Sequence, residues 1–370
     1  MKILHIPTGG LFSDGIGTFI YSYLECMDLD KWEVTVLATN IPLLEDKAKF
    51  ENLGIQVVVL ERKKTAIIHY MCQLYKLIRA NKYDIIHVHG SSSLMSIELS
   101  VAKIAGVPVR IAHSHNTTCD HRKLDKVLRP VFHKLYTQAW ACGEGAGKWL
   151  FTNREYTIVH NARNIKRYQF SESKRQQFRK KLSLKDTTLA LGHVGRFNVQ
   201  KNHEFLVLLM ENLVIQGLDV KLFLVGEGST LSKIKNMVSE KSLEDRVFLL
   251  GHLNDMKSFV SAMDIMLLPS LYEGLPLVSV EWQINGIQCI LSDTITKECI
   301  YTKQVTSLPI GTPLYWGKAI RDFCPEDRLR QSIENQRLAR EAGYDIELES
   351  VKLDTLYNKL IMAIKDRTRK

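Results

Sequence analysis

Short apolar runs recur along the whole chain, and helix-like segments separate each run from the next. A continuous apolar run such as 265–268 is typical of a strand that is buried on both faces of a parallel sheet. Successive runs lie roughly 20 to 30 residues apart, which is the spacing of β-α-β units. The pattern therefore predicts an α/β protein with parallel sheets covered by helices. The predicted strands are 2–7, 33–38, 56–60, 84–88, 109–114, 139–142, 156–159, 188–194, 221–225, 247–250, 265–268 and 288–292.

The length of the chain and one polar segment predict how it divides into domains. With 370 residues the chain can form two domains of ordinary size, each with its own core. The polar stretch 161–186 shows no strand pattern, so a linker is expected near residues 164–168. We expect one domain over residues 1–165, a second over 166–345 and a helical tail over 346–370. The apolar stripe of that tail is expected to consist of Leu348, Val351, Leu356, Leu360, Ile361 and Ile364.

The chain has an excess of positive charge, with a formal net charge of +10 and a pI of about 9.1. Such a charge suits nucleic acid, an anionic membrane surface or anionic small molecules. Basic and aromatic residues are not interleaved as in nucleic-acid-binding modules, so nucleic acid is not an expected partner. A solvated basic face and peripheral contact with anionic lipid both stay open as interpretations. The segment 67–78 is apolar enough for a membrane interface, but a core-facing helix is the favoured interpretation.

The composition is typical of a soluble globular protein, with 45% apolar and 24% charged residues. No stretch approaches the roughly 20 apolar residues that a membrane span needs. The first seven residues are interpreted as a β-strand and not as a signal peptide. The seven cysteines include no Cys-x-x-Cys pair, which indicates free thiols in a reducing cytosol. We therefore expect a cytoplasmic protein.

The most informative motif is the segment 269–281, which follows an apolar strand. Pro276 is expected at the first position of a helix, whose free N–H groups and positive dipole end suit a phosphate. Glu273 precedes this helix start and Glu281 lies one to two turns into the helix. Carboxylates accept hydrogen bonds from the hydroxyls of a sugar. Phosphate and sugar together indicate a nucleotide-sugar site.

Other strand ends of the second half offer groups for the same ligand, because open parallel sheets bind ligands at the carboxyl ends of their strands. Arg196 and Lys201 follow the predicted strand 188–194, and two permanent cations suit a diphosphate. Gly226 follows the next strand, where its turn either admits a nucleobase or packs closely as a loop. His252 follows the strand after that and is a candidate contact to the base or the ribose.

A glycine-rich turn follows the first predicted strand of the chain. Gly15 and Gly17 let the backbone approach a phosphate or a sugar closely. The turn is not the dinucleotide-binding fingerprint, because Ile20 stands where a third glycine or alanine belongs. No Gly-Lys-Ser/Thr follows it, so it is not a P-loop either.

Two histidines, His113 and His115, stand at the end of another predicted strand of the first half. Such a histidine can hydrogen-bond a sugar hydroxyl or stabilise charge in a transition state. A metal pair is disfavoured, because no cysteine or acidic ligand stands at the usual spacing. His87 and His89 end a further strand and could line the same site, but packing is the favoured interpretation for them.

Taken in order, these motifs resemble those of the retaining glycosyltransferases of family 4, which have the GT-B fold. The motifs are the glycine-rich first loop, the strand-end histidine, Gly-Arg-Phe-x-x-x-Lys, Val-Gly-x-Gly, Gly-His and Pro-Ser-x-x-Glu-Gly-x-Pro-x-x-x-x-Glu. The resemblance covers nearly the whole chain and is greatest to bacterial enzymes of capsular or exopolysaccharide assembly. It implies two Rossmann-like domains that face a cleft, the first binding the acceptor and the second binding the donor. It also implies that the tail helix packs back on the first domain.

The resemblance implies a role for each candidate residue. Arg196 and Lys201 would hold the donor diphosphate, and Glu281 would accept from the ribose hydroxyls. Glu273 would lie at the sugar, with His113 the first choice for the catalytic-site histidine and His115 the alternative. The other implied donor contacts are Gly15, Gly17, Gly226, His252, Gly274, Leu275 and Leu277.

The implied reaction transfers a hexosyl unit from a nucleoside diphosphate sugar with retention at the anomeric carbon. UDP is the expected nucleotide, and a hydroxyl of a glycan or a lipid-linked oligosaccharide is the expected acceptor. Neither a metal nor another cofactor is expected. A position at the inner face of the cell membrane would suit the basic charge and a lipid-linked acceptor. The rival interpretations are an epimerase or phosphorylase of the same fold and a nonenzymatic subunit that binds nucleotide sugars.

Overall fold

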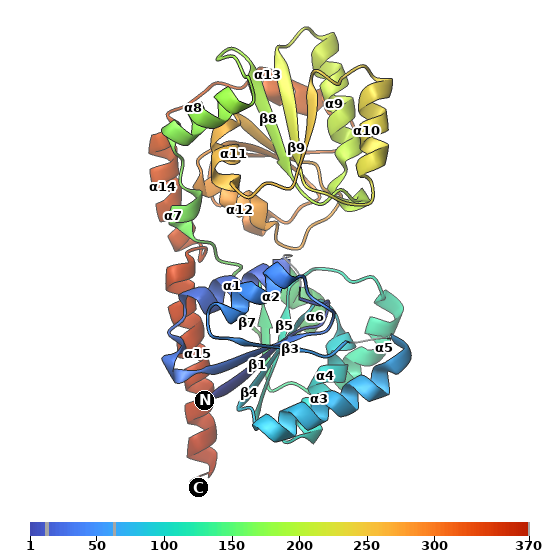
Figure 1. Ribbon diagram of the computed structural model, residues 1–370, viewed down its shortest axis with the longest axis vertical. Coiled ribbons are helices and arrows are strands. Elements are labelled where there is room, and N and C mark those ends of the chain that lie inside the picture. Colours follow the sequence, from blue (N-terminus) through green and yellow to red (C-terminus); the bar gives the residue numbers. More distant parts are fainter. Residues whose placement is uncertain (12–14, 62–63, 369–370) are drawn as a thin grey trace. The chain divides into compact units, whose positions relative to one another are not determined.

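The computed structural model describes residues 1–11, 15–61 and 64–368, and it divides the chain into two units (Figure 1). Unit 1 consists of Met1–Arg163 together with Asp345–Lys370, and unit 2 consists of Asn164–Tyr344. Each unit contains one sheet in which every strand pairing is parallel. The predicted α/β class with two parallel sheets is therefore confirmed.

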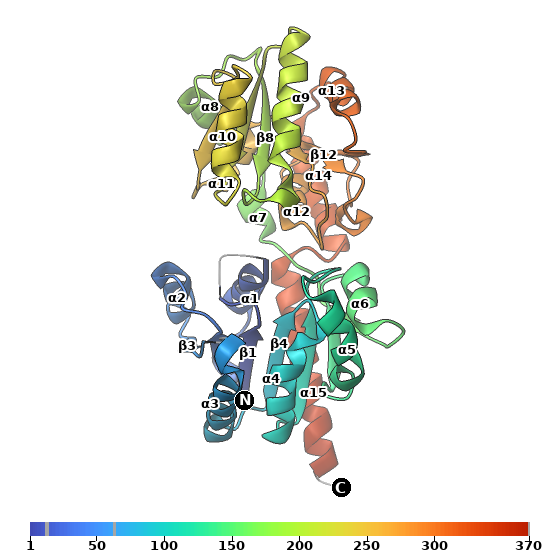
Figure 2. The ribbon, with the colours of Figure 1, turned by 90° about the vertical axis from the view of Figure 1, so that its right-hand side faces the viewer.

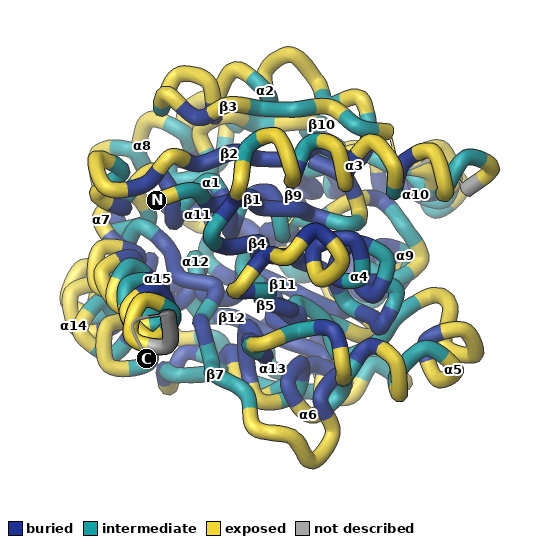
Figure 3. The backbone as a smooth tube through the Cα atoms, turned by 90° about the horizontal axis from the view of Figure 1, so that it is seen from below, coloured by how far each residue is buried: buried dark blue, intermediate teal, exposed yellow. Residues whose placement is uncertain are grey.

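The sheet of unit 1 has seven strands in the order β3-β2-β1-β4-β5-β6-β7. Figure 3 looks at this unit from below and shows buried strands with α15 on one side and α3 and α4 on the other. The strands are β1 Lys2–Pro7, β2 Glu33–Ala38, β3 Gln56–Val59, β4 Ile85–Gly90, β5 Val109–Ser114, β6 Gln138–Ala141 and β7 Thr157–Ile158. The helices are α1 Gly15–Cys26, α2 Leu44–Glu51, α3 Ile67–Asn81, α4 Ser96–Ile104, α5 Arg122–Phe132, α6 Glu144–Phe151 and α15 Ile346–Thr368. Three short 3-10 turns accompany them, η1 Leu29–Lys31, η2 Lys64–Ala66 and η3 Ser93–Met95.

The C-terminal helix α15 packs against α1 within unit 1. Its core-facing side chains include Ile346, Leu353 and Tyr357, which are at most 1% exposed. The predicted apolar stripe of this helix is wrong at Leu348 and Val351, which are exposed. Those two positions fall outside the face of the helix that carries the buried residues 346, 353, 357 and 361. The predicted members Leu356, Leu360 and Ile364 pack against the same core. Among the described residues no helix, α15 included, combines the length and the apolar character of a membrane span.

The sheet of unit 2 has six strands in the order β10-β9-β8-β11-β12-β13. The strands are β8 Leu189–Val194, β9 Val220–Val225, β10 Val247–Gly251, β11 Ile265–Leu268, β12 Gln288–Ser292 and β13 Val305–Leu308. The helices are α7 Ile165–Tyr168, α8 Glu172–Lys181, α9 His203–Ile215, α10 Leu231–Glu240, α11 Met256–Ala262, α12 Leu277–Ile284, α13 Pro313–Arg321 and α14 Arg328–Glu341. The 3-10 turns are η4 Val199–Lys201 and η5 Lys297–Cys299.

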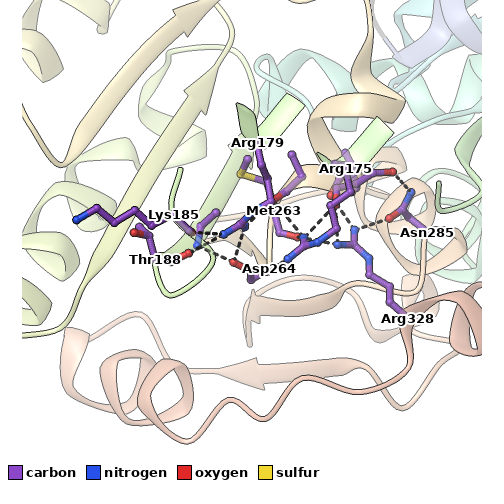
Figure 4. Close-up of polar contacts among 12 residues, drawn as sticks. Arg175, Arg179, Lys185, Thr188, Met263, Asp264, Asn285 and Arg328 are labelled. Atoms are coloured by element: carbon purple, nitrogen blue, oxygen red, sulfur yellow. Dashed lines mark hydrogen bonds and ion pairs between the residues drawn. The ribbon is translucent and has the colours of Figure 1, made fainter. Parts of the chain in front are cut away.

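An arginine network closes the amino-terminal end of the unit 2 sheet (Figure 4). Asp264, just before β11, accepts from Arg175 at 2.6 Å and from Arg179 at 3.1 Å, both on α8. Arg328 of α14 donates to the Val260 carbonyl at 2.7 Å and to the carbonyls of neighbouring residues. Burial lowers the pKa of Arg328 to about 9. These contacts fix α8 and α14 to the segment that leads into β11.

Candidate functional site

The order of the strands brings two of the predicted motifs together in unit 2. β8 and β11 are neighbours in the middle of the sheet. The strands that follow β8, namely β9 and β10, lie on one side of the pair, and the strands that follow β11, namely β12 and β13, lie on the other side. The carboxyl ends of such a pair form the switch point at which open parallel sheets bind ligands. The loop that carries Arg196 and Lys201 follows β8, and the loop that carries Glu273 follows β11. The two loops also hydrogen-bond to each other, because the N–H of Leu271 donates to the Gln200 carbonyl at 2.8 Å.

Lys201 and Glu273 form an ion pair at this edge, with 2.6 Å between Nζ and Oε1. Their side chains are only 16% and 10% exposed. The amide of Gln200 adds a bond of 3.3 Å to the other carboxylate oxygen, Oε2. The motifs implied separate roles for these two residues, at the diphosphate and at the sugar. The structure joins them, so Lys201 can contact a phosphate while it positions Glu273.

Arg196 lies in the same loop and is exposed. Among the described residues its guanidinium has no ion-pair or hydrogen-bond partner. The next residue, Phe197, is fully buried and stacks on His203 with 3.9 Å between the ring centroids. The backbone that carries Arg196 is therefore fixed, while the charged group itself faces solvent and is available to an anion.

Gly226 lies where the loop after β9 packs against the loop after β8. Its φ is +136°, and a Cβ at this position would stand 2.1 Å from the Gly195 carbonyl oxygen. Gly228 is similarly confined, since a Cβ there would stand 2.2 Å from the Phe197 carbonyl oxygen. Of the two interpretations for Gly226, the structure favours the close-packed loop over an opening for a nucleobase. The N–H of Gly226 donates to the carbonyl of Gly251 at 2.9 Å. His252, the residue after Gly251, is exposed.

Helix α12 begins at Leu277, one residue later than predicted, because Pro276 is the N-cap in extended backbone conformation. Gly274 and Leu277 are half-buried, and Leu275 is buried. Glu281 is half-buried and lies one turn into the helix. The start of this helix follows β11, so its N–H groups lie at the same edge of the sheet as the Lys201–Glu273 pair.

In unit 1 the switch point lies between β1 and β4, which are neighbours in the sheet. The glycine-rich turn follows β1, and its residues 12–14 lie outside the described part of the chain. Gly15 is exposed at the first position of α1, and Gly17 is buried in that helix.

Beside this switch point five histidines from three adjacent strands form one group, which we call the histidine cluster. Four of them are at most 2% exposed, and His115 is half-buried. The strand register explains the grouping, because His5 pairs with His87 and His89 pairs with His113 across the sheet. The members are His5, His87, His89, His113 and His115.

One row of hydrogen bonds in the cluster begins at Tyr357 of α15. The Tyr357 hydroxyl lies 2.7 Å from Nδ1 of His87, and Nε2 of His87 lies 3.0 Å from Nδ1 of His113. Burial raises the pKa of Tyr357, so the phenol keeps its proton. Burial and the neighbouring imidazoles lower the pKa of His87 and of His113, so both are neutral. In the tautomer in which the phenol donates to Nδ1 of His87, His87 donates from Nε2 and His113 carries its own proton on Nε2.

A second row runs outward to His115. Nδ1 of His5 lies 3.0 Å from Nε2 of His89, and Nδ1 of His89 lies 3.0 Å from Nε2 of His115. Burial lowers the pKa of His5 to about 3. Burial lowers the pKa of His115 to about 3 as well, although the neighbouring Asn161 side chain raises it. The row therefore ends in a neutral imidazole at the carboxyl edge of the sheet.

The predicted first choice, His113, is fully buried, and its Nε2 has no hydrogen-bond partner among the described residues. Phe19 covers it edge-on, with 5.0 Å between the ring centroids. His115 is half-buried, but its Nδ1 is buried and its Nε2 is hydrogen-bonded to His89. The choice between the two histidines therefore stays a prediction.

Two sets of three imidazoles could geometrically surround a metal ion, since their nitrogen atoms lie within 4.8 Å of one another. The sets are His5, His87 and His89, and His89, His113 and His115. Hydrogen bonds of 3.0 Å already join members of both sets. The structure therefore shows these imidazoles paired with one another.

Sequence reasoning missed the contributions of His5, Gln200 and Tyr357 to these sites. His5 lies inside the first strand, where nothing in the local pattern distinguishes it from a core residue. Tyr357 is 270 residues from its hydrogen-bond partner His87 in the chain, and only the packing of α15 brings it there. A strand register could have revealed His5, because histidines at matching positions of neighbouring strands meet.

Comparison with known proteins identifies the family. A model of the family described as "Glycosyltransferase Family 4" matches residues 13–161, and a model described as "Glycosyl transferases group 1" matches residues 174–306. The chain belongs to the family 4 glycosyltransferases. It is therefore a transferase enzyme, as the motifs implied.

Two curated relatives match most of this glycosyltransferase. A protein of Bacillus subtilis (strain 168), named "Putative glycosyltransferase EpsF", is 29% identical over all of this chain and 98% of its own length. A second relative, from Escherichia coli, is named UDP-Gal:alpha-D-GlcNAc-diphosphoundecaprenol alpha-1,3-galactosyltransferase. It is 26% identical over 81% of this chain and 81% of its own length.

Solved structures share the fold of this glycosyltransferase. Alr3699/HepE of Anabaena, solved with UDP-glucose, superimposes with a TM-score of 0.76 at 16% identity over 97% of this chain and 100% of its own. Sucrose-phosphate synthase of Thermosynechococcus elongatus gives a TM-score of 0.77 at 16% identity over 98% of this chain and 100% of its own. The GT-B fold implied by the sequence motifs is confirmed.

Proposed function

We propose that this enzyme transfers a hexosyl unit from a UDP-sugar to a hydroxyl of a glycan or a lipid-linked oligosaccharide, with retention at the anomeric carbon. The name of the relative from Escherichia coli supports a UDP-sugar donor and a diphosphate-linked lipid acceptor. The resemblance of the sequence motifs supports a role in exopolysaccharide or capsule assembly. The proposed location is the cytoplasm, at the inner face of the cell membrane.

One observation carries the proposal, namely the meeting of the Lys201–Glu273 pair and the start of α12 at the switch point of unit 2. A diphosphate suits this edge, because Arg196 and Lys201 supply cations and α12 supplies free N–H groups. Glu273, held by Lys201, accepts from hydroxyls of the donor sugar, and Glu281 accepts from the ribose. Backbone N–H groups of 274, 275 and 277 complete the contacts.

In the proposed step the bond between the anomeric carbon and the diphosphate oxygen breaks as the acceptor oxygen bonds to that carbon from the same face. The proton of the acceptor hydroxyl passes to the departing phosphate oxygen. Negative charge grows on the diphosphate during this step, and Arg196, Lys201 and the N–H groups of α12 stabilise it. The cationic side chains can stabilise the departing diphosphate, which a metal ion does in other transferases. We therefore expect full activity in excess chelator.

We propose His115 as the imidazole of unit 1 that contacts a reacting sugar. The row of hydrogen bonds from His5 through His89 holds its ring, and its neutral state lets it donate or accept a hydrogen bond without a charge. His113 then acts as a packing and positioning group behind it, since the two ring centroids are 4.1 Å apart.

Product analysis tests this function directly. The enzyme is incubated with UDP-hexoses and a lipid diphosphate-linked sugar, and released UDP and the product are measured. Release of UDP only when acceptor is present, with an α-linked product from an α-linked donor, is the expected result. A β-linked product would contradict retention. Conversion of the donor without acceptor would indicate an epimerase, and binding without any product would indicate the nonenzymatic subunit.

A further inference from the structure

Three imidazoles of the histidine cluster lie close to the arrangement of a metal site. One ring nitrogen each of His89, His113 and His115 lies within 4.8 Å of the other two, and we call these residues the outer set. Nδ1 of His89 and Nε2 of His115 are 3.0 Å apart. A tetrahedral zinc site with bonds of about 2.0–2.1 Å holds its ligand nitrogens roughly 3.4 Å apart. A modest turn of the rings would therefore bring the three nitrogens to ligand positions.

The outer set has nitrogens to offer to an ion, whereas the set that contains His87 does not. Nε2 of His113 is buried and has no hydrogen-bond partner among the described residues. The bond between His89 and His115 lies inside the outer set, so an ion can replace it. Both nitrogens of His87 are bonded outside its own set, to Tyr357 at 2.7 Å and to His113 at 3.0 Å.

Asn161 can orient the ring of His115 for an ion. A metal-bound imidazole almost always donates its other N–H to a neighbouring group, which fixes the ring. Nδ1 of His115 and Oδ1 of Asn161 are both buried, and neither has a hydrogen-bond partner among the described residues. Burial lowers the pKa of His115 and the Asn161 side chain opposes that shift, so the two groups are neighbours. His115 can therefore donate from Nδ1 to Asn161 and keep the lone pair of Nε2 for an ion.

His89 and His113 have equivalent partners behind them. Nε2 of His89 lies 3.0 Å from Nδ1 of His5, and Nδ1 of His113 lies 3.0 Å from Nε2 of His87. When each ring carries its proton on the nitrogen that faces this partner, its opposite nitrogen has a lone pair for an ion. Burial and the neighbouring imidazoles hold the pKa of His89 and of His113 well below 6.5. The rings are therefore neutral, and an ion has no proton to displace into solvent.

We propose that the outer set binds one zinc ion. Three neutral imidazoles suit Zn²⁺, whereas Mg²⁺ and Ca²⁺ prefer oxygen ligands. The ion can enter beside His115, which is half-buried and follows the end of β5. Phe19 of α1 packs edge-on against His113 and His115 and gives the site an apolar cover. Figure 2 shows α1 at the end of β1, which pairs with the strand of His89, β4.

A bound zinc ion should inhibit the transfer reaction, and this step rests on the proposed function. In that function the imidazole of His115 contacts a reacting sugar. Coordination would occupy the lone pair of its Nε2 and add a divalent cation at the carboxyl edge of the unit 1 sheet. The imidazole would then be lost to the substrate. The ion is thus an inhibitor and not a cofactor, in keeping with the full activity that we expect in excess chelator.

Titration of the full-length protein with Co²⁺ tests the site without any substrate. The protein is treated with chelator, the chelator is removed, and Co²⁺ is added while the visible spectrum is recorded. We expect the intense absorption bands of tetrahedral Co²⁺, with saturation at one ion per chain. Zn²⁺ should remove these bands, because it binds such sites more tightly than Co²⁺ does. Mg²⁺ should leave them unchanged.

Three variants identify the ligands, and the melting temperature of each shows that it is folded. His115→Ala should abolish the tetrahedral bands. Asn161→Ala keeps all three imidazoles and should weaken the affinity for Co²⁺ by about 10- to 100-fold. His69→Ala, at an exposed histidine of unit 1, is the matched control and should bind Co²⁺ as the parent does.

Several results would overturn the zinc site. Absence of tetrahedral bands in the parent would do so, as would bands that persist unchanged in both His115→Ala and Asn161→Ala. Loss of the bands in His69→Ala would assign the ion to surface histidines instead.

The inhibition is tested separately in the transfer assay. Zn²⁺ should abolish transfer by the parent, and chelator should restore it. Transfer that Zn²⁺ leaves unchanged, in a protein that shows the cobalt bands, would overturn the inhibition and keep the zinc site. The cobalt spectrum needs neither donor nor acceptor. A failed metal site would therefore leave the proposed transfer reaction standing, and a failed transfer reaction would leave the cobalt result intact.

Discussion

Breaking the Lys201–Glu273 pair should destabilise unit 2 and weaken donor binding at the same time. Lys201→Met keeps most of the side-chain volume but leaves the carboxylate, 10% exposed, with only the 3.3 Å bond from Gln200. Removal of one partner of a fully buried pair costs about 3–5 kcal/mol. The partial exposure of both groups lets water compensate for part of this loss, so we expect about 2–3 kcal/mol.

The expected cost can be measured by calorimetry on the full chain. For a domain of the size of unit 2, about 2–3 kcal/mol corresponds to a fall of about 4–12 °C in the midpoint of its unfolding transition. The double variant Lys201→Met/Glu273→Gln removes both charges and should recover about 1–2 kcal/mol of the loss. A matched control is Lys233→Met, which breaks an equally short pair with Glu204 whose side chains are 59% and 42% exposed. That exposed pair should contribute less than about 1 kcal/mol.

The same variants separate stability from ligand binding. Both the single and the double variant should lose affinity for UDP, because each lacks the ammonium group that we propose as a contact to the diphosphate. The reasoning would be refuted if Lys201→Met were as stable as the parent. It would also be refuted if the double variant were no more stable than the single one, since the pair would then have no measurable coupling.

Buried groups lead to three further predictions. Burial lowers the pKa of His5 and His115 from 6.5 to about 3, so the unfolded chain binds more protons between these values. The contribution of each histidine to the free energy of unfolding is complete above about pH 6.5. It is lost as the pH falls, at up to about 1.4 kcal/mol per pH unit. A melting midpoint of unit 1 that stays constant from neutral to acid pH would contradict this prediction. His115→Ala should lower kcat about 100-fold beyond its effect on the melting temperature, whereas His113→Ala should mainly lower the melting temperature. The reverse outcome would restore the first choice. Gly226→Ala places a Cβ 2.1 Å from the backbone carbonyl oxygen of Gly195. It should lower the free energy of unfolding, measured with denaturant, by about 3 kcal/mol or more. An unchanged free energy of unfolding would show that the two loops can separate.

The sequence predicted most strands of both sheets because buried parallel strands are continuous apolar runs. Twelve strands were expected, and each lies within two residues of an observed strand at either end. The strand β13 was missed, since its sequence Val-Thr-Ser-Leu is half polar and all four residues are only half-buried at the edge of the sheet. An edge strand lacks the signal that identified the others.

The sequence predicted which residues belong to the candidate site, but not how these residues contact one another. Strand-end position identified Arg196, Lys201 and Glu273, because the carboxyl edge of a parallel sheet is where ligands bind. The ion pair between Lys201 and Glu273 depends on β8 and β11 being neighbours, which no local pattern reveals. Likewise, the packing of Phe19 on both His113 and His115, with 5.0 Å between ring centroids in each case, depends on how α1 covers the sheet.

The direct test of the central claim, that the carboxyl edge of unit 2 binds a nucleoside diphosphate sugar, is a calorimetric titration of UDP into the parent and into Arg196→Ala. The Arg196 guanidinium is exposed and has no partner among the described residues, so its removal leaves folding intact. Loss of one charge-assisted contact should cost about 1.5–3 kcal/mol, which is a fall in affinity of roughly tenfold or more. Lys235→Ala, an exposed lysine on α10, is the control and should bind UDP as the parent does. Equal affinity of the parent and Arg196→Ala for UDP, or no binding to either, would contradict the account.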